Sequence, residues 1–235
     1  MLHYDYRVIN NIFNKGGVKV PKSTFFNLAK DKIDKIIKVS INEFVEYSYE
    51  NASINRIVED AEIAKGSFYQ YFEDKKDLYK YIVEEAHEKK KLYFVDVLKN
   101  QNGLDYFDLL KDIFLTEIKF ARELPKLTYI ILDFSRSRHI EFKREILTDT
   151  SFFNSVYEEL TIKGIDNRAL DDDTDIALNV YLLKSLNISI VEYFIYETNL
   201  DYEKTINYID NIVELLRDGV KAKKRIKRNF EDRFY

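Results

Sequence analysis

The residues best suited to bind another molecule lie in one short segment of this chain, residues 63–72 (IAKGSFYQYF). The segment combines a lysine, a serine, an amide and two tyrosines, and it contains no acidic residue, although acidic residues stand on both sides of it. Cations, hydroxyls, amides and aromatic rings contact the phosphates and base edges of DNA, and a carboxylate among them would repel phosphates. The segment is therefore a candidate surface for contact with DNA.

Two short helices joined by a tight turn are predicted to position this surface. Ser53 is a natural N-cap for the first helix. Its apolar face consists of residues at helical spacing, namely Ile54, Ile57, Val58 and Ala61. The turn follows at residues 62–65, and the second helix begins near Gly66 with Phe68 and Phe72 on its inner side. The side chains left to face outward or sideways are Lys65, Ser67, Tyr69, Gln70 and Tyr71.

A further helix is expected to open at Asp74, with Asp77 three residues later as a variant of the capping box. Lys75 and Lys76 lie in the first turn of that helix. The helix dipole disfavours cations at this position unless an anion is nearby to receive them. A DNA phosphate would be such an anion, so Lys75 is expected to contact the DNA backbone.

At these residues the chain resembles the DNA-binding domain of the TetR family of transcriptional regulators. Residues 65–72, followed by Lys75 and Leu78, fit the family signature K-G-[ST]-[LF]-Y-x-[YH]-F-x-x-K-x-x-L without a gap. The resemblance covers roughly residues 22–90, and beyond them only the helix pattern and the length support it. The alternative interpretation of the segment is an ordinary helical hairpin whose aromatic residues all belong to the core.

Two positions depart from the family pattern. Glu62 stands where a turn glycine is common, which indicates a turn that either avoids a positive φ or tolerates strain. Ala64 stands where serine or threonine is common, so one possible phosphate contact is lost. Neither departure changes the predicted helix-turn-helix arrangement.

The resemblance implies DNA contacts from both short helices and from the start of the next one. The residues expected to hold phosphates are Tyr69, Tyr71 and Lys75, and those expected to read bases are Lys65, Ser67 and Gln70. Glutamine is best suited to adenine. The complete predicted set is Ser53, Asn55, Arg56, Ala64, Lys65, Gly66, Ser67, Tyr69, Gln70, Tyr71 and Lys75.

The composition predicts an all-α protein. The 235 residues include only six Gly and two Pro, so there is little material for turns. The absence of Cys excludes disulfides and thiolate metal sites and favours a cytoplasmic location. No apolar run approaches the roughly 20 residues of a membrane span. The net charge of −4 does not indicate a nucleic-acid binder, so local patches have to attract DNA.

No set of residues with catalytic spacing is present, and neither an enzyme nor a cofactor is expected. The three histidines share no metal-ligand spacing; they are His3, His87 and His139. The three successive acids at 171–173 are expected to cap and solvate the following helix rather than to bind a cation.

The chain divides into four predicted segments. Residues 1–21 are an N-terminal arm or a mis-assigned start, with translation from Val20 as the second possibility. Residues 22–73 form the three-helix DNA-binding head, and residues 74–100 form the helix that connects it to the rest. Residues 101–235 form a larger helical bundle for ligand binding and dimerisation.

Two long amphipathic helices are predicted near the C-terminus, at roughly 174–196 and 201–224. Their apolar stripes are wide enough for both a monomer core and a partner. The resemblance implies that this pair packs against its mate as a four-helix dimer bundle. A symmetric dimer would present two recognition helices to successive major grooves, about 34–36 Å apart.

The second region is rich in aromatic residues, which favours a hydrophobic or partly aromatic effector, although core packing explains most of them equally well. The candidate ligand residues are Phe107, Leu110, Phe114, Tyr129, Phe134, His139, Tyr157 and Tyr181. The prediction is a homodimeric repressor that binds a palindromic operator and is released by a small molecule. The alternative is a helical ligand-binding or interaction protein of the same fold that binds no DNA.

Overall fold

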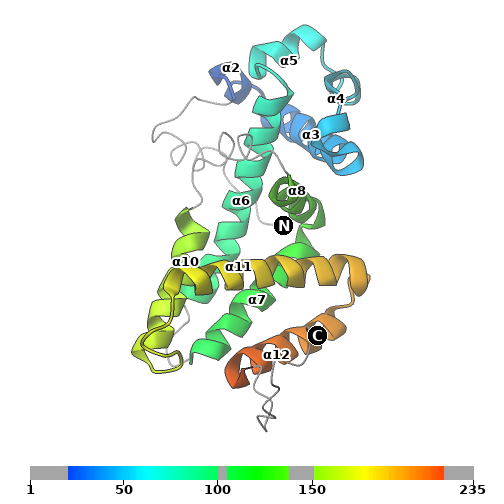
Figure 1. The fold of residues 1–235 in the computed structure, drawn as a ribbon. Coiled ribbons are helices and arrows are strands. Elements are labelled where there is room, and N and C mark those ends of the chain that lie inside the picture. Colours follow the sequence, from blue (N-terminus) through cyan, green and yellow to red (C-terminus); the bar gives the residue numbers. More distant parts are fainter. Residues whose placement is uncertain (1–20, 100–104, 138–150, 220–235) are drawn as a thin grey trace, which may run out of the picture. The chain divides into compact units, whose positions relative to one another are not determined.

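The structure is a computed structural model that describes residues 21–99, 105–137 and 151–219, and every regular element within these ranges is a helix (Figure 1). The predicted all-α class is confirmed for this part of the chain. The N-terminal arm with the possible start at Val20 lies outside the described residues, as does His139.

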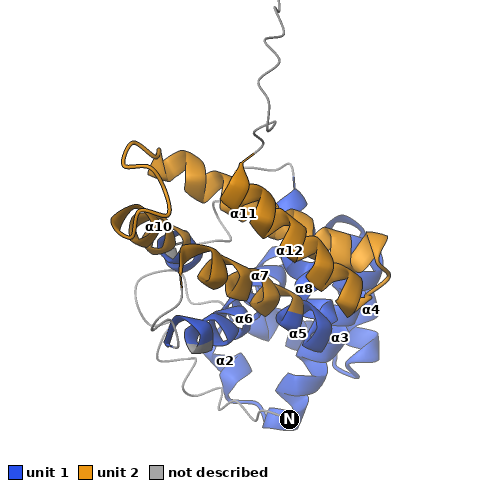
Figure 2. Cartoon of the chain, turned by 90° about the horizontal axis from the view of Figure 1, so that it is seen from below, with its two compact units in different colours: residues 1–100, 119–156 blue, residues 101–118, 157–235 orange. Residues whose placement is uncertain are grey.

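The chain forms two compact units, which are coloured separately in Figure 2. Unit 1 contains residues 1–100 and 119–156, and unit 2 contains residues 101–118 and 157–235. Residues 119–156 were expected in the second domain, but they group with the N-terminal head because helix α8 packs against α3 and α6.

Six of the helices in the described ranges lie wholly in unit 1. They are α2 (Ser23–Phe26), α3 (Lys30–Asn51), α4 (Ile54–Asp60), α5 (Lys65–Tyr71), α6 (Lys75–Lys99) and α8 (Pro125–Arg136). Phe25 of α2 joins α5 to α6, since its ring centroid lies 5.0 Å from that of Phe72 and 5.8 Å from that of Tyr81. All three side chains are buried, so the short helices are held by one aromatic core.

Helix α3 is the longest helix of the head, and its buried residues recur at helical spacing. Its buried residues are Ile33, Ile36, Ile37, Ser40, Glu43 and Phe44. The helix is interrupted at Ser48, whose φ of 57° and ψ of 169° are not helical. A last turn then runs to Asn51, and Ala52 is the C-cap. The sequence pattern did not predict this interruption.

Helix α6 begins with the predicted reciprocal cap. The Asp74 carboxylate accepts a hydrogen bond of 2.9 Å from the Asp77 backbone N–H, and the Asp77 carboxylate accepts one of 3.0 Å from the Glu73 backbone N–H. Both bonds satisfy backbone donors that a helix start would otherwise leave without partners. The capping prediction is confirmed.

Unit 2 contains the two long helices predicted near the C-terminus. Helix α11 (Ile176–Glu192) continues into the π-helix η1 (Tyr193–Glu197), and α12 (Tyr202–Asp218) follows. Both begin at an aspartate N-cap, because the Asp175 carboxylate accepts from the Leu178 N–H and the Asp201 carboxylate from the Lys204 N–H. Helices α7 (Tyr106–Glu123) and α10 (Ser151–Asp166) have residues in both units.

Gly164 lies inside α10, where a close approach requires a glycine. A Cβ at this position would lie 2.7 Å from the Tyr106 ring and 2.9 Å from the Leu170 side chain. The chain turns after α10 at Arg168, which has a φ of 59°. The Gly164 carbonyl accepts the backbone N–H groups of Ala169 and Leu170.

Candidate nucleic-acid interface

Helix α5 presents the acid-free surface that its sequence predicts. Phe68 and Phe72 are fully buried, so they fix the inner side of the helix as expected. The opposite side exposes Lys65, Tyr69 and Gln70, with 44% of the Tyr69 side chain accessible. A cation, a phenol and an amide are thus available to a groove of DNA.

The predicted outward orientation of Tyr71 is wrong. The residue is only 5% exposed, and its ring centroid lies 5.9 Å from that of Phe25. Helix α2, which the sequence pattern did not reveal, covers this side of α5. The Lys22 N–H donates to the Tyr71 carbonyl at 2.9 Å, and the Thr24 hydroxyl donates to the Gln70 carbonyl. Tyr71 therefore serves the core and offers little surface for a phosphate.

Lys22 is a candidate residue that sequence reasoning missed. Its exposed side chain donates from Nζ to the Tyr69 carbonyl at 3.1 Å, which places a cation at the C-terminal end of α5. Such a cation balances the negative end of the helix dipole and adds positive charge beside the exposed tyrosine. Its position just before a short helix gave no recognisable signal in the sequence.

The turn between α4 and α5 tolerates a positive φ without glycine. Glu62 has a φ of 55°, so the second of the two possibilities for this position is confirmed. Its carboxylate lies 2.7 Å from the Lys35 ammonium, and the hydrogen bond to Lys35 lowers the pKa of Glu62. The turn is closed by backbone bonds, since the Ile63 N–H donates to the Val58 carbonyl at 3.0 Å.

Both short helices lack a side-chain cap. Ser53 occupies the predicted N-cap position of α4, but its hydroxyl makes no capping bond. Its backbone N–H instead donates to the Glu43 carboxylate at 2.6 Å. Ala64 is the N-cap of α5 and has no group with which to cap it. The start of α4 is consequently held by α3 rather than by its own serine.

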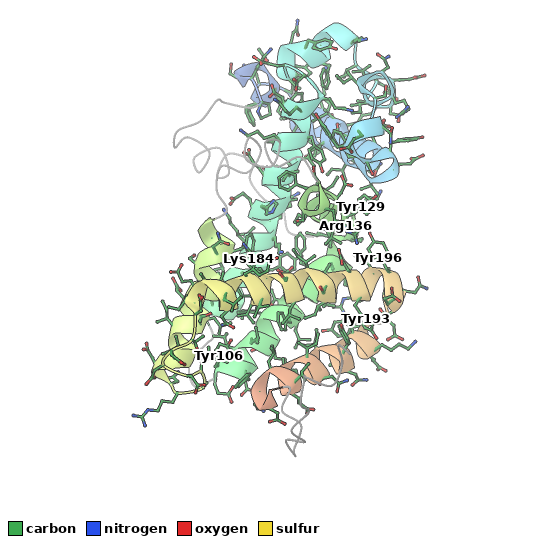
Figure 3. All side chains as sticks on the ribbon, in the orientation of Figure 1. Tyr106, Tyr129, Arg136, Lys184, Tyr193 and Tyr196 are labelled. Atoms are coloured by element: carbon green, nitrogen blue, oxygen red, sulfur yellow. The ribbon has the colours of Figure 1, made fainter. Side chains whose placement is uncertain are left out.

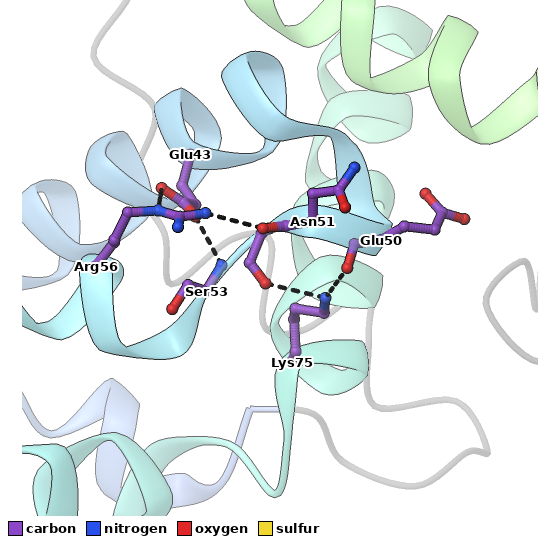
Figure 4. A network of polar contacts seen from close by, with 7 residues as sticks. Glu43, Glu50, Asn51, Ser53, Arg56 and Lys75 are labelled. Atoms are coloured by element: carbon purple, nitrogen blue, oxygen red, sulfur yellow. Dashed lines mark hydrogen bonds and ion pairs between the residues drawn. The ribbon is translucent and has the colours of Figure 1, made fainter.

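Arg56 binds inside the head, as Figure 4 shows. Its Nε donates to both Glu43 oxygens, at 2.9 and 3.1 Å, and one of its terminal nitrogens donates to the Asn51 carbonyl at 2.8 Å. The guanidinium also lies 4.0 Å from the centre of the Tyr47 ring. The bonds to Glu43 raise the pKa of Arg56. The side chain therefore fixes α4 on α3, whereas the neighbouring Asn55 is exposed.

Lys75 also finds its partners within the head (Figure 4). Its Nζ donates to the Glu50 and Ala52 carbonyls, both at 3.0 Å, and lies 4.8 Å from the centre of the Tyr49 ring. Burial lowers the pKa of this ammonium. Carbonyl dipoles at the C-terminal end of α3 thus stabilise the Lys75 ammonium within the head, and its contact with a DNA phosphate stays a prediction.

Comparisons with known proteins agree with this geometry. A family model described as bacterial regulatory proteins, tetR family, matches residues 36–82, which include α4, the turn and α5. An HTH-type transcriptional regulator of Staphylococcus aureus is 27% identical over 196 residues, covering 78% of this chain and 93% of that protein. A TetR family transcriptional regulator from Chloroflexus aurantiacus is 27% identical with a TM-score of 0.68, covering 86% of this chain and 98% of that one. The chain belongs to the TetR family.

Two further solved structures share the fold of this TetR-family chain. The regulator FadR from Bacillus subtilis, in complex with stearoyl-CoA, has a TM-score of 0.66 at 16% identity and covers 80% of this chain and 98% of that one. The fatty acid degradation regulator FadR from Bacillus halodurans has a TM-score of 0.64 at 20% identity, covering 80% and 99%. At these identities the likeness establishes the fold alone.

The candidate ligand residues of this TetR-family chain fall into both units. Four are buried in unit 2, namely Phe107, Leu110, Phe114 and Tyr157. Tyr181 belongs to the same unit but is 69% exposed on α11, so it lines no buried site. Tyr129 and Phe134 lie on α8 in unit 1, where Tyr129 is labelled in Figure 3.

Two buried polar atoms in unit 2 were not singled out by sequence reasoning. The Tyr157 hydroxyl and the Asn187 side-chain carbonyl have no hydrogen-bond partner among the described residues. Burial raises the pKa of Tyr157, so this phenol stays protonated and can donate. Within the same ranges no group of three His, Cys, Asp or Glu residues could hold a metal ion, and none of the described helices has the length and apolar character needed to cross a membrane.

Proposed function

We propose that this TetR-family transcriptional regulator is a repressor that binds a palindromic operator as a homodimer and is released by a small hydrophobic ligand. The observation that carries the proposal is the outer side of α5, which is exposed, free of acids and fixed from behind by Phe68 and Phe72. A short helix held rigidly from one side can present its other side to the major groove.

The proposed DNA contacts are divided between α5 and its neighbours. Gln70 and Lys65 read base edges, Ser67 adds a hydroxyl, and Tyr69 holds a phosphate. Lys22 adds a second phosphate contact at the end of the helix. Arg56 and Lys75 are assigned a supporting role, because they are only partly exposed and donate within the head, whereas Lys22 is exposed.

A homodimer is proposed from an exposed apolar stripe on α11. Leu178, Tyr181, Leu182 and Ile188 recur at helical spacing, and 37–69% of each side chain is accessible. On α12, Leu215 and Leu216 are also exposed. Large apolar side chains gathered on neighbouring helices favour burial by a partner, and a second copy offers the same stripe in return.

The effector is proposed to be a hydrophobic molecule with at least one polar group. An aromatic and aliphatic core in unit 2 suits the hydrophobic part, and the Tyr157 hydroxyl and Asn187 carbonyl suit the polar part. The stearoyl-CoA bound by Bacillus subtilis FadR supports an acyl chain as one such ligand. Release requires that the ligand bind more tightly to the state that does not fit the operator.

A gel-shift titration with the DNA upstream of the protein's own gene tests the proposal. Wild-type protein should bind, and its affinity should fall steeply as salt rises, because phosphate contacts release counterions. Gln70→Ala should lower the preference for that DNA over a scrambled duplex by roughly 5- to 100-fold, the effect of one good base contact. Asp172→Asn, at an exposed acid of unit 2 that is outside the predicted DNA-binding set, serves as the control. Absence of binding at low salt would favour the alternative that the fold binds no DNA.

A further inference from the structure

The backbone is strained near the end of helix α3, at a residue that is not glycine. Ser48 combines a φ of 57° with a ψ of 169°, a region that is nearly exclusive to glycine. A serine persists there only where the surrounding structure imposes the conformation. The five residues 48–52, named here the kinked turn, are thus held by contacts from elsewhere in unit 1.

One carboxylate, that of Asp133 on α8, binds the strained residue and its neighbours. Helix α8 packs against α3, and burial raises the pKa of Asp133 while hydrogen bonding from the Tyr49 backbone and the Ser48 side chain lowers it. The Asp133 carboxylate also accepts a bond of 3.2 Å from the hydroxyl of Tyr79, a residue of α6 that is 1% exposed. A single side chain of α8 therefore ties the kinked turn to α6.

The carbonyls of the same kinked turn bind the residues that position the DNA-binding helices. The Asn51 carbonyl accepts from Arg56 of α4, and the Glu50 and Ala52 carbonyls accept from Lys75 of α6. These carbonyls point at their donors only while the backbone is bent at Ser48. If α3 continued as a straight helix, each carbonyl would turn along the helix axis.

We propose that Asp133 is a positioning residue for DNA binding: it holds the kinked turn bent and thereby sets α4 and α5 for the groove. The inference rests on the proposed function, since it concerns the affinity for DNA. The path of contacts runs from α8 through Asp133 to the kinked turn, and from there through Arg56 to α4 and, by the Glu62 turn, to α5. A displacement of α8 would reach the DNA-binding surface by this path.

Three variants separate a positioning role from a merely structural one. Asp133→Ala removes all three hydrogen bonds, Asp133→Asn keeps a carbonyl that still accepts some of them, and Tyr79→Phe removes one hydroxyl from a packed ring. Asp172→Asn is the matched control, because Asp172 is an exposed acid in unit 2. Each variant is measured in the full-length protein for amide hydrogen exchange in residues 48–60, and for affinity to the upstream DNA and to a scrambled duplex at low salt.

The positioning role predicts graded losses in folded protein. Asp133→Ala should speed exchange in residues 48–60 and weaken binding to both duplexes by at least about tenfold, which corresponds to about 1.4 kcal/mol. Asp133→Asn and Tyr79→Phe should each cost about threefold, and the control should match the wild type. If Asp133→Ala does not fold, the two milder variants decide the matter.

Two other results would overturn the inference or its premise. Exchange and affinity that match the Asp172→Asn control would refute the positioning role, as would variants that melt at lower temperature but bind DNA with unchanged affinity once folded. A wild-type protein that binds neither duplex would refute the proposed function instead. In that case the exchange rates would still show whether Asp133 holds the kinked turn and α4.

Discussion

Two turns in the DNA-binding head place a non-glycine residue at positive φ, and they are held in different ways. At Glu62 the closing bonds are local, since they join Ile63 to Val58 and Glu62 to Glu59. At the kinked turn the partners come from distant elements, because Ser48 interacts with Asp133 on α8 and the Tyr49 ring lies 4.8 Å from the Tyr79 ring on α6. A turn closed by bonds among neighbouring residues keeps its conformation when other helices move. A turn held by contacts with distant helices changes conformation when those helices move.

The largest loss of stability is expected from a substitution of Glu43, which binds Arg56 next to the kinked turn. Its carboxylate is 5% exposed and binds both the Ser53 N–H and the Arg56 guanidinium. Glu43→Ala leaves these donors without a partner and should lower the free energy of unfolding by about 3 kcal/mol. Urea denaturation measures this change.

The matched control for Glu43→Ala is Lys35→Ala, at the other turn. The ion pair of Lys35 with Glu62 is exposed, with 40% and 81% of the two side chains accessible, so its removal should have no measurable effect. Equal losses in the two variants would contradict the distinction between a turn held locally and a turn held by buried contacts.

The stability of the helix that contacts the kinked turn is expected to depend on pH, because α6 carries a buried acid. Glu85 is 4% exposed, one of its oxygens has no partner in the described part of the chain, and burial raises its pKa from 4.5 to about 7. The folded state keeps this proton after the unfolded state has lost it. The stability that the neutral acid contributes is therefore present below pH 4.5 and lost as the pH rises to 7.

Glu85→Gln should remove this dependence. Relative to the wild type, its free energy of unfolding should increase by about 3 kcal/mol between pH 4.5 and 7, since each pKa unit corresponds to about 1.4 kcal/mol. His87 gives the opposite sign: burial between aromatic rings lowers its pKa from 6.5 to about 4, so its contribution is lost as the pH falls. A Glu85→Gln difference that is constant across this pH range would show that the acid does not titrate as described.

The difference between the turns also explains what the sequence could predict. The segment from Ser53 to Leu78 was recognised because its helices, its turn and its cap depend on residues a few positions apart. The inner positions of Phe68 and Phe72 and the cap at Asp74 were confirmed for the same reason. Helical spacing likewise predicted the two long helices near the C-terminus.

The failures concern contacts between residues that are distant in the sequence. Tyr71 was expected outside because helix α2 is only four residues long and leaves no periodic pattern. No local pattern indicated that Lys75 donates to carbonyls of the kinked turn, and its predicted phosphate contact stays a prediction. The bend at Ser48 depends on Asp133, and no local pattern relates these two residues. Tertiary contacts decided each of these cases.

A smaller effect is expected from the hydroxyl of Ser48 alone. Ser48→Ala removes its bond to Asp133 and favours continuation of α3 as a straight helix, so the free energy of unfolding should fall by about 1 kcal/mol. Glu62→Ala is the matched variant at the other turn and should leave stability within error of the wild type. Thermal unfolding followed by circular dichroism measures both, and a larger loss in Glu62→Ala would reverse the assignment of the two turns.

The smallest effect is expected from Glu62→Gly, which restores the glycine common at this position in the TetR family. Glycine adopts a φ of 55° without strain, so the folded state gains, but the unfolded chain gains conformational freedom that offsets most of it. The midpoint of thermal unfolding should therefore rise by only about 1–3 °C. Affinity for the upstream DNA should not change, because the backbone bonds that close the turn remain. A lower midpoint together with weaker DNA binding would show that the Lys35 pair, rather than the local backbone, holds this turn.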